Sequence, residues 1–248
     1  MPILGDIKVV KHVKPIVFVI ERTSVSKKTE LISNLVDTIL DFYITYDSAD
    51  YEYKFCFLFF SETINLYSDK LVDVDSILPL NELMSKSKID ASSILETLNE
   101  NLSRKKLLTP DNTYSSPYIY FFGDGNSEYI NTEKIDTFLN ENKWLKIAKK
   151  RAVLIEQPSK ETLGFFAKFT GDVENIGIID GENTSNADFF QEIISSITAD
   201  INSLGGMISS HPSPVFSGFW NEIDNKFIHV DPIEDDDTWS LSGDDTWE

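Results

Sequence analysis

Short apolar runs, spaced at intervals along the chain, constrain the fold more than any other feature of the sequence. Each run is rich in β-branched or aromatic residues and is mostly unbroken, which is typical of strands whose two faces are both buried. The runs occupy residues 15–20, 54–60, 118–122, 151–155 and 175–179. Strands of this kind predict a central sheet that is covered on both sides.

Segments with helical periodicity separate or follow these runs. Apolar residues recur at intervals of three and four over 31–43, 94–102 and 190–201, which predicts amphipathic helices. Strands that alternate with helices form parallel βαβ units, with right-handed crossovers and helices on both faces. The alternating segment 63–67 directly follows the second run and predicts a hairpin partner strand at the sheet edge. The sequence therefore predicts an α/β fold with a mainly parallel sheet.

The charge and composition exclude several classes of protein. The chain of 248 residues has 41% hydrophobic residues, enough for a buried core, and a formal net charge of −19. Such an acidic chain is not expected to bind nucleic acid without regard to sequence, and no stretch approaches the roughly 20 apolar residues of a membrane helix. Cys56 is the one cysteine. It lies within an apolar run and is expected to be a buried thiol in a reducing, cytoplasmic protein.

The character of the chain changes after about residue 205. Residues 1–204 are expected to form one compact domain, whereas residues 205–230 are rich in Gly, Ser and Pro and lack helical periodicity. Within that extension, residues 220–230 are compatible with a small hairpin. Residues 231–248 form an acidic tail with eight acidic residues and no lysine or arginine. We expect this tail to be disordered on its own.

Oxygen-bearing side chains stand at three places that a parallel sheet can bring to one edge. Glu21 and Thr23 follow the first run, Asp124 follows the central run, and Ser92 opens the helix before it. Ligands of open α/β sheets bind at the carboxyl ends of the strands, and hard divalent cations prefer carboxylate, hydroxyl and water oxygens. These residues are therefore candidate metal ligands. The same residue types also cap helices and form ordinary turns, so spacing alone leaves both interpretations open.

The order of the segments resembles that of a von Willebrand factor A domain over roughly residues 12–204. The resemblance is carried by PIVFVIERTSVS, FCFLFFSETINLY, IDASSILETL, YIYFFGDGNSE and RAVLI. The later segment FFQEIISSITADINSL is similar to the closing helix of the bacterial tellurite-resistance TerY-like branch. The resemblance implies a three-layer, Rossmann-like α/β fold whose mainly parallel central sheet has one antiparallel edge strand.

The family's metal-ion-dependent adhesion site has an Asp-x-Ser-x-Ser loop after the first strand, a Thr in the next loop and an Asp after the central strand. Carried onto this chain, these positions fall on Glu21, Thr23, Val25, Ser92 and Asp124. Valine offers no oxygen, and glutamate is one methylene longer than aspartate, which suits poorly the near-octahedral geometry that Mg²⁺ demands. The resemblance therefore implies a degenerate site, with a divalent cation (Mg²⁺, Mn²⁺ or Ca²⁺) as the cofactor to be tested.

The acidic tail carries a repeated DDTW unit. It places Thr238 beside Trp239, and Thr246 beside Trp247. A tryptophan flanked by acidic residues is suited to a pocket with a basic rim, and two copies allow bivalent binding. The alternative is a tail that only keeps the chain soluble. Both threonines are also candidate phosphorylation sites, and the resemblance implies a protein kinase and a PP2C-type phosphatase as partners.

The sequence pattern does not assemble a nucleophile, a base and an oxyanion donor, so no enzymatic activity is expected. The favoured hypothesis is a non-enzymatic adaptor that binds partner proteins through the carboxyl-end loops of the sheet and through the tail. The resemblance connects such an adaptor with a bacterial kinase- and phosphatase-linked stress or tellurite-resistance-type system. Two alternatives stay open. One is a metal-dependent α/β phosphohydrolase in which Asp124 and Glu21 hold the ion, and the other is a purely structural subunit of a complex.

Overall fold

The structure, a computed structural model, describes residues 12–22, 26–45, 51–61, 64–73 and 88–179. The helix expected over 190–201, the extension 205–230 and the acidic tail lie outside the described residues. The same holds for the tail's candidate binding residues, which are Thr238, Trp239, Thr246 and Trp247. The expected domain boundaries therefore stay predictions.

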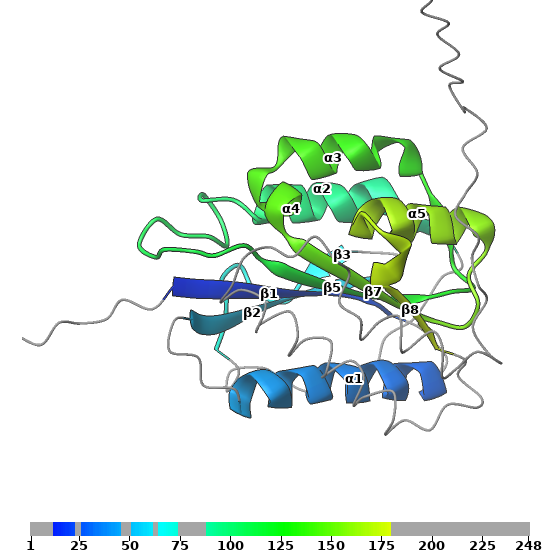
Figure 1. Ribbon diagram of the computed structural model, residues 1–248, viewed down its shortest axis with the longest axis horizontal. Helices are drawn as coiled ribbons and strands as arrows, with labels where there is room; N and C mark the ends of the chain where they lie inside the picture. Colours follow the sequence, from blue (N-terminus) through cyan, green and yellow to red (C-terminus); the bar gives the residue numbers. More distant parts are fainter. Residues whose placement is uncertain (1–11, 23–25, 46–50, 62–63, 74–87, 180–248) are drawn as a thin grey trace, which may run out of the picture.

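A six-stranded sheet forms the centre of the fold, with its strands in the order β3-β2-β1-β5-β7-β8 (Figure 1). Neighbouring strands run parallel except for β3, which pairs antiparallel with β2 at the edge. The strands are β1 (His12–Glu21), β2 (Tyr51–Phe60), β3 (Ile64–Leu66), β5 (Tyr118–Asp124), β7 (Lys149–Ile155) and β8 (Ile176–Ile179). Each apolar run is one of the parallel strands, and the segment 63–67 contains the antiparallel edge strand. The predicted fold class is confirmed.

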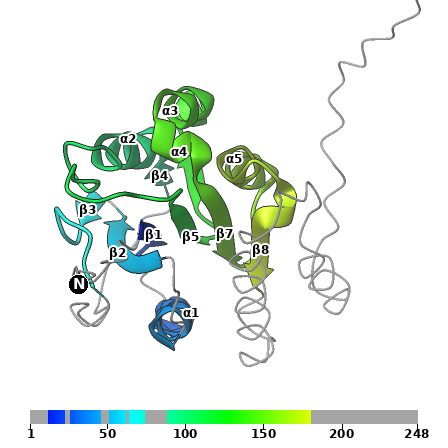
Figure 2. The ribbon, with the colours of Figure 1, turned by 60° about the vertical axis from the view of Figure 1, so that its left-hand side comes forward.

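Helices cover both faces of the sheet (Figures 1 and 2). Helix α1 (Ser26–Thr45) lies on one face. The opposite face carries α2 (Ala91–Asn101), α3 (Ile135–Glu141), α4 (Lys143–Ile147) and α5 (Lys160–Thr170). Within the part of the chain that the structure describes, no helix combines the length and the apolar character that a membrane crossing requires.

Several short elements have no counterpart in the sequence prediction. Strands β4 (Lys88–Asp90) and β6 (Glu128–Ile130) pair in parallel as a separate two-stranded sheet. Two 3₁₀ turns cover Thr132–Lys134 and Val173–Asn175. Elements of three residues are too short to show a period, which is why the sequence did not indicate them.

Helix α5 is likewise absent from the prediction, although its ends carry recognisable signals. The Ser159 hydroxyl accepts a hydrogen bond from the backbone N–H of Thr162 and so caps the start of the helix. Gly171 ends it in the left-handed conformation, with φ of 83°, which glycine adopts without steric cost. Local chemistry thus fixes both ends of a helix that lies close to the candidate site.

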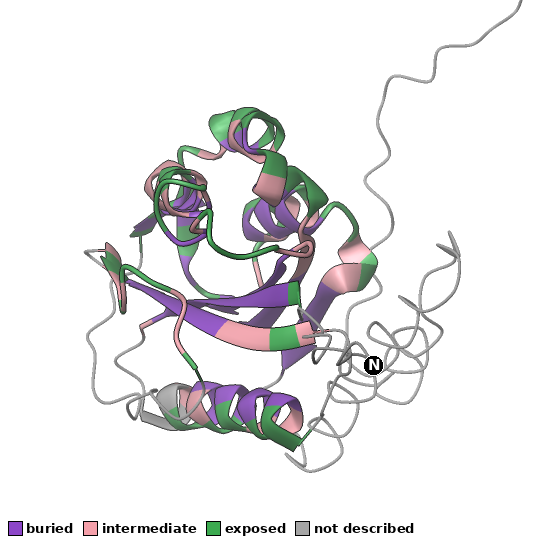
Figure 3. Cartoon of the chain, turned by 90° about the vertical axis from the view of Figure 1, so that its left-hand side faces the viewer, coloured by how far each residue is buried: buried purple, intermediate pink, exposed green. Residues whose placement is uncertain are grey.

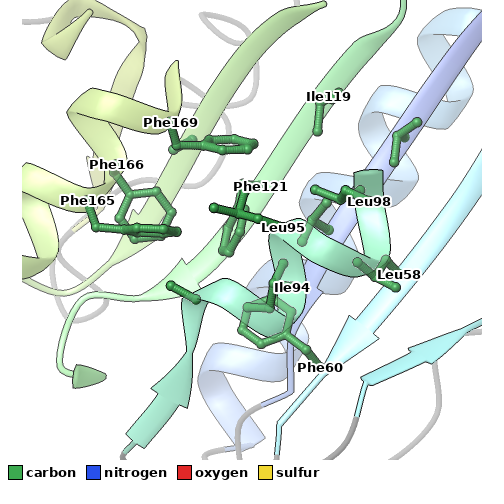
Figure 4. Close-up of a cluster of buried hydrophobic side chains, with 14 of the residues drawn as sticks. Leu58, Phe60, Ile94, Leu95, Leu98, Ile119, Phe121, Phe165, Phe166 and Phe169 are labelled. Carbon is green, nitrogen blue, oxygen red and sulfur yellow. The ribbon is translucent and has the colours of Figure 1, made fainter. Parts of the chain in front are cut away.

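Apolar side chains pack on both sides of the sheet. On the side of α1, the rings of Phe18 and Phe57 stack with their centroids 4.9 Å apart. On the other side, Phe121 of β5 meets Phe166 of α5 edge to face at 4.8 Å (Figure 4). Most of the sheet is buried, except for β3 and the first residues of β2, and the helices expose their outer surfaces (Figure 3). The core therefore consists of two layers separated by the sheet.

Cys56 lies in β2 with 1% of its surface exposed, which confirms the expected buried thiol. Burial raises the pKa of this thiol to about 12, because a thiolate would lose its hydration there. The side chain is therefore a protonated, small apolar group at neutral pH and not a nucleophile.

Candidate functional site

Four charged residues meet where the parallel strands end, and we call them the carboxyl edge: Glu21, Lys28, Asp124 and Glu156. Glu21 ends β1, Asp124 ends the neighbouring β5, and Glu156 directly follows β7. Lys28 belongs to the first turn of α1. The backbone N–H of Asp124 donates to Oε2 of Glu21 at 2.7 Å. Two of the residues predicted to share a site are therefore in direct contact.

The carboxylate of Glu21 points into the protein and is satisfied by three donors. It is 1% exposed. Its Oε2 atom accepts from the hydroxyl of Tyr129 at 2.7 Å and from the Asp124 N–H, while Oε1 accepts from the hydroxyl of Ser127. Ser127 directly precedes β6 and Tyr129 lies within it, just after the turn that follows Asp124. The longer side chain of glutamate thus reaches the hydrogen-bond donors of that turn and of β6.

Burial raises the pKa of the Glu21 carboxyl from 4.5 to about 7, because a charge is poorly solvated there. The hydrogen bonds from Ser127, Asp124 and Tyr129 oppose this rise, and the negative charge of Asp124 adds to it. Burial, together with the nearby Glu21, also raises the pKa of the Tyr129 hydroxyl well above its usual range. Glu21 therefore exchanges its proton near neutral pH, while Tyr129 stays a donor.

The ammonium group of Lys28 is bound to Asp124 through both carboxylate oxygens, at 2.8 Å and 2.9 Å. A second carboxylate, that of Glu156, lies 3.9 Å away. The side chains of Lys28 and Asp124 are each 12% exposed, and that of Glu156 is 32% exposed. The Oδ1 atom of Asp124 also accepts from the backbone N–H of Asn126 at 3.0 Å. This ion pair is therefore largely shielded from water, with Glu156 on its exposed side.

The turn after β5 is held against the end of β7 and the start of α5. Gly125 N–H donates to the carbonyl of Ile155 at 2.7 Å, and a Cβ atom at this glycine would lie 2.1 Å from the Glu156 carbonyl oxygen. The Thr162 hydroxyl donates to the carbonyl of Ser127 at 3.0 Å. These contacts fix the backbone that carries Asp124 and Ser127. The carboxyl edge is consequently a rigid surface.

Ser92 does not reach the charged residues through its hydroxyl in this structure, because that hydroxyl donates to the carbonyl of Asn131 at 2.6 Å. The alternative interpretation of Ser92 as a helix cap is wrong. Helix α2 is capped by Asp90, which accepts from the backbone N–H of Ser93 at 3.4 Å and from its hydroxyl at 2.9 Å. Thr23, the remaining candidate ligand, lies outside the described residues.

The carboxylates of the carboxyl edge do not fit a divalent metal ion as they are arranged. Both oxygens of Asp124 contact the Lys28 ammonium, and the carboxylate of Glu21 is turned toward three protein donors. Among the described residues there is also no group of three or more His, Cys, Asp or Glu side chains placed to hold a metal. An ion at Asp124 would have to displace Lys28.

Sequence reasoning missed Lys28, Ser127 and Tyr129. One signal was available: a lysine in the first turn of a helix faces the positive end of the helix dipole, which costs about 0.3–1 kcal/mol unless an anion is near. The identity of the anion depends on how the sheet and α1 pack. The set of donors around Glu21 likewise depends on the path of the chain after Asp124, which periodicity does not report.

Comparison with solved structures places this geometry in a known fold. The chain matches proximal thread matrix protein 1 from the mussel byssus at 15% identity and a TM-score of 0.50, over 75% of this chain and 45% of that one. It matches a von Willebrand factor type A protein from Catenulispora acidiphila at 12% identity and a TM-score of 0.50, over 76% and 43%. The human COPII-coat protein Sec24c aligns at 8% identity and a TM-score of 0.52, over 77% and 33%.

These likenesses and the strand order show that the chain has the von Willebrand factor A fold. The chain spans less than half the length of each of these solved chains. No protein-family model matches the sequence, and neither does any curated protein. Beyond the fold, the function has to be inferred from the carboxyl edge itself.

Proposed function

We propose that this protein is a non-enzymatic adaptor of the bacterial cytoplasm that binds partner proteins through the carboxyl edge and through the acidic tail. The observation that supports it is the state of the edge: its charged groups are already paired, on a backbone held by buried hydrogen bonds. A fixed, partly exposed polar surface can bind a partner without reorganising, which lowers the entropic cost of association.

The same arrangement speaks against a metal-dependent phosphohydrolase. Such an enzyme needs carboxylates that are free to hold an ion and a base that is free to accept a proton. In the described residues, Asp124 is neutralised by Lys28, and Glu21 is 1% exposed and surrounded by donors. Glu156 keeps 32% of its side chain exposed and is the acceptor best placed to contact a partner.

The tail is the second part of the proposal, and it rests on the sequence alone. Trp239 and Trp247 are the proposed anchors, and Thr238 and Thr246 beside them are proposed phosphorylation sites. A phosphate at either threonine would add almost two negative charges to an already acidic segment. The resemblance to TerY-like proteins supports a protein kinase and a PP2C-type phosphatase as the partners, in a stress or tellurite-resistance-type system.

Affinity capture from native cytoplasm tests the two surfaces separately. The intact chain is compared with a chain that lacks residues 231–248 and with Glu156→Lys, which reverses a partly exposed charge of the carboxyl edge. Glu174→Lys is the matched control, because Glu174 is exposed and precedes β8 at the opposite end of the strands. Circular dichroism confirms that each variant is folded.

We expect Glu156→Lys to release one set of partners, tail deletion to release another, and Glu174→Lys to release none. If tail deletion alone changes the captured set, the carboxyl edge has no role in binding. A captured set that is identical for every variant leaves a structural subunit as the better explanation and contradicts the adaptor.

A further inference from the structure

We infer that the Lys28 ammonium is a built-in cation that takes the position of a divalent metal at Asp124, so that the carboxyl edge is complete without a metal ion. The inference concerns the binding chemistry of this edge and does not depend on which partner the edge contacts.

The geometry of the ammonium group is that of a bound cation. Its nitrogen contacts both oxygens of one carboxylate, at 2.8 Å and 2.9 Å, and lies 3.9 Å from an oxygen of a second. The two carboxylates, Asp124 and Glu156, come from the ends of neighbouring strands, and the cation comes from α1 on one face of the sheet. Three separate elements therefore converge on one positive charge.

The position of Lys28 destabilises a positive charge unless an anion is near. It lies in the first turn of α1, where the helix dipole disfavours a cation, and its side chain is 12% exposed, which removes most of its hydration. The contacts with Asp124 offset both costs. Because the lysine is covalently attached, the charge is present at any concentration of free metal.

Glu21, the other carboxylate of the predicted metal site, is bound to protein donors instead. Glu21 accepts from Ser127, from Tyr129 and from the Asp124 backbone, and a metal ligand at this position would have to give up these buried bonds. An ammonium group can donate three hydrogen bonds, whereas Mg²⁺ and Ca²⁺ take six or more oxygens, some of them from water. The edge gives the lysine two hydrogen bonds, both to Asp124, and the Glu156 carboxylate at 3.9 Å adds an electrostatic contact.

Titration of the purified full chain with Mn²⁺, followed by electron paramagnetic resonance of free Mn²⁺, tests the inference. The samples are the wild type, Asp124→Asn, Lys28→Met, Lys28→Met with Asp124→Asn, and Lys54→Met. Lys54 is the matched control, because it too lies near two carboxylates, those of Glu52 at 3.2 Å and Asp73 at 3.7 Å. The acidic tail is common to every sample, so its contribution cancels in the differences.

We expect Lys28→Met to bind one additional Mn²⁺ at least about tenfold more tightly than the wild type, because removing the ammonium leaves the charge of Asp124 without its partner. Adding Asp124→Asn should abolish that site, and Lys54→Met should behave as the wild type. In parallel, Mn²⁺ should raise the urea midpoint of Lys28→Met and leave that of the wild type in place.

Two results would overturn the inference. One is a wild-type Mn²⁺ site that Asp124→Asn removes, since a metal would then displace Lys28. The other is equal Mn²⁺ binding by Lys28→Met and the wild type, since Lys28 would then not occupy a cation position. If Lys28→Met does not fold without metal, the wild-type titration and the Lys28→Arg variant still decide, because the arginine keeps the charge and should exclude Mn²⁺.

Discussion

The ammonium nitrogen of Lys28 lies 2.8 Å and 2.9 Å from the two carboxylate oxygens of Asp124, a residue 96 positions further along the chain. This contact joins the start of α1 to the end of the central strand β5. It thereby fixes the position of α1 at the edge of the sheet where the von Willebrand factor A fold presents its strand ends.

A double-mutant cycle with Lys28→Met and Asp124→Asn measures the strength of this contact. Both side chains are only 12% exposed, so we expect a coupling free energy of about 1–3 kcal/mol in urea unfolding. The pair Lys106–Glu100, with side chains 46% and 59% exposed, is the control and should couple by less than about 1 kcal/mol. Equal coupling free energies in the two pairs would mean that the buried ion pair stabilises the fold no more than an exposed one.

Glu21→Gln should change how stability depends on pH. The pKa of Glu21 is raised from 4.5 to about 7 by burial, so the folded state favours the protonated carboxyl. That contribution is fully present below pH 4.5 and is lost as the pH rises through about 7. The wild type should lose about 3 kcal/mol over this window through Glu21 alone.

Glutamine is always neutral and can reproduce the bonds of a protonated Glu21. Its oxygen can accept from Tyr129 and Asp124, and its amide can donate to Ser127, which are the partners of Glu21 in the structure. The stability of Glu21→Gln relative to the wild type should therefore increase from pH 5 to pH 8 in urea titrations. A constant difference over this range would show that Glu21 does not titrate with a raised pKa.

Tyr129→Phe should destabilise the protein more at pH 8 than at pH 5. The Tyr129 hydroxyl donates to Glu21 at 2.7 Å, and a hydrogen bond to a charged group contributes about 1.5–3 kcal/mol against about 0.5–1.5 kcal/mol for a neutral one. Tyr43→Phe is the control, because the Tyr43 hydroxyl bonds to the neutral hydroxyl of Tyr120 at 3.0 Å. The loss of stability in the control should be the same at both pH values. A similar pH dependence in the two variants would show that the Tyr129 hydrogen bond does not depend on the charge of Glu21.

The sheet could be predicted from the sequence because its signals are local. Unbroken apolar runs predict strands that are buried on both faces. The rule that the carboxyl ends of parallel strands meet at one edge predicts that Glu21 and Asp124 lie close together. Helix α5 escaped prediction although its inward face is aromatic, with Phe165, Phe166 and Phe169 buried. Adjacent phenylalanines do not distinguish a helix from a short strand by period alone.

The chemistry of the site was less accessible because it depends on tertiary contacts. The sequence shows that Glu21 is one methylene longer than aspartate, but only the fold shows that Ser127 and Tyr129 receive that carboxylate. It shows a lysine in the first turn of a helix, but only the packing of α1 against the sheet shows that Asp124 is its partner. The contact partners of such side chains leave no periodic pattern in the sequence.

Two glycines near the site should respond to alanine in opposite directions. At Gly125 an added Cβ would lie 2.1 Å from the carbonyl oxygen of Glu156, whereas at Gly164 in α5 nothing lies within 4 Å of it. Gly125→Ala must move the backbone that carries Asp124, so we expect a loss of about 3 kcal/mol in urea unfolding. Gly164→Ala should gain about 0.5–1 kcal/mol, because alanine loses less conformational entropy in a helix. Similar midpoints for the two variants would mean that the end of β5 can adjust without cost, and the carboxyl edge would not be the rigid surface described above.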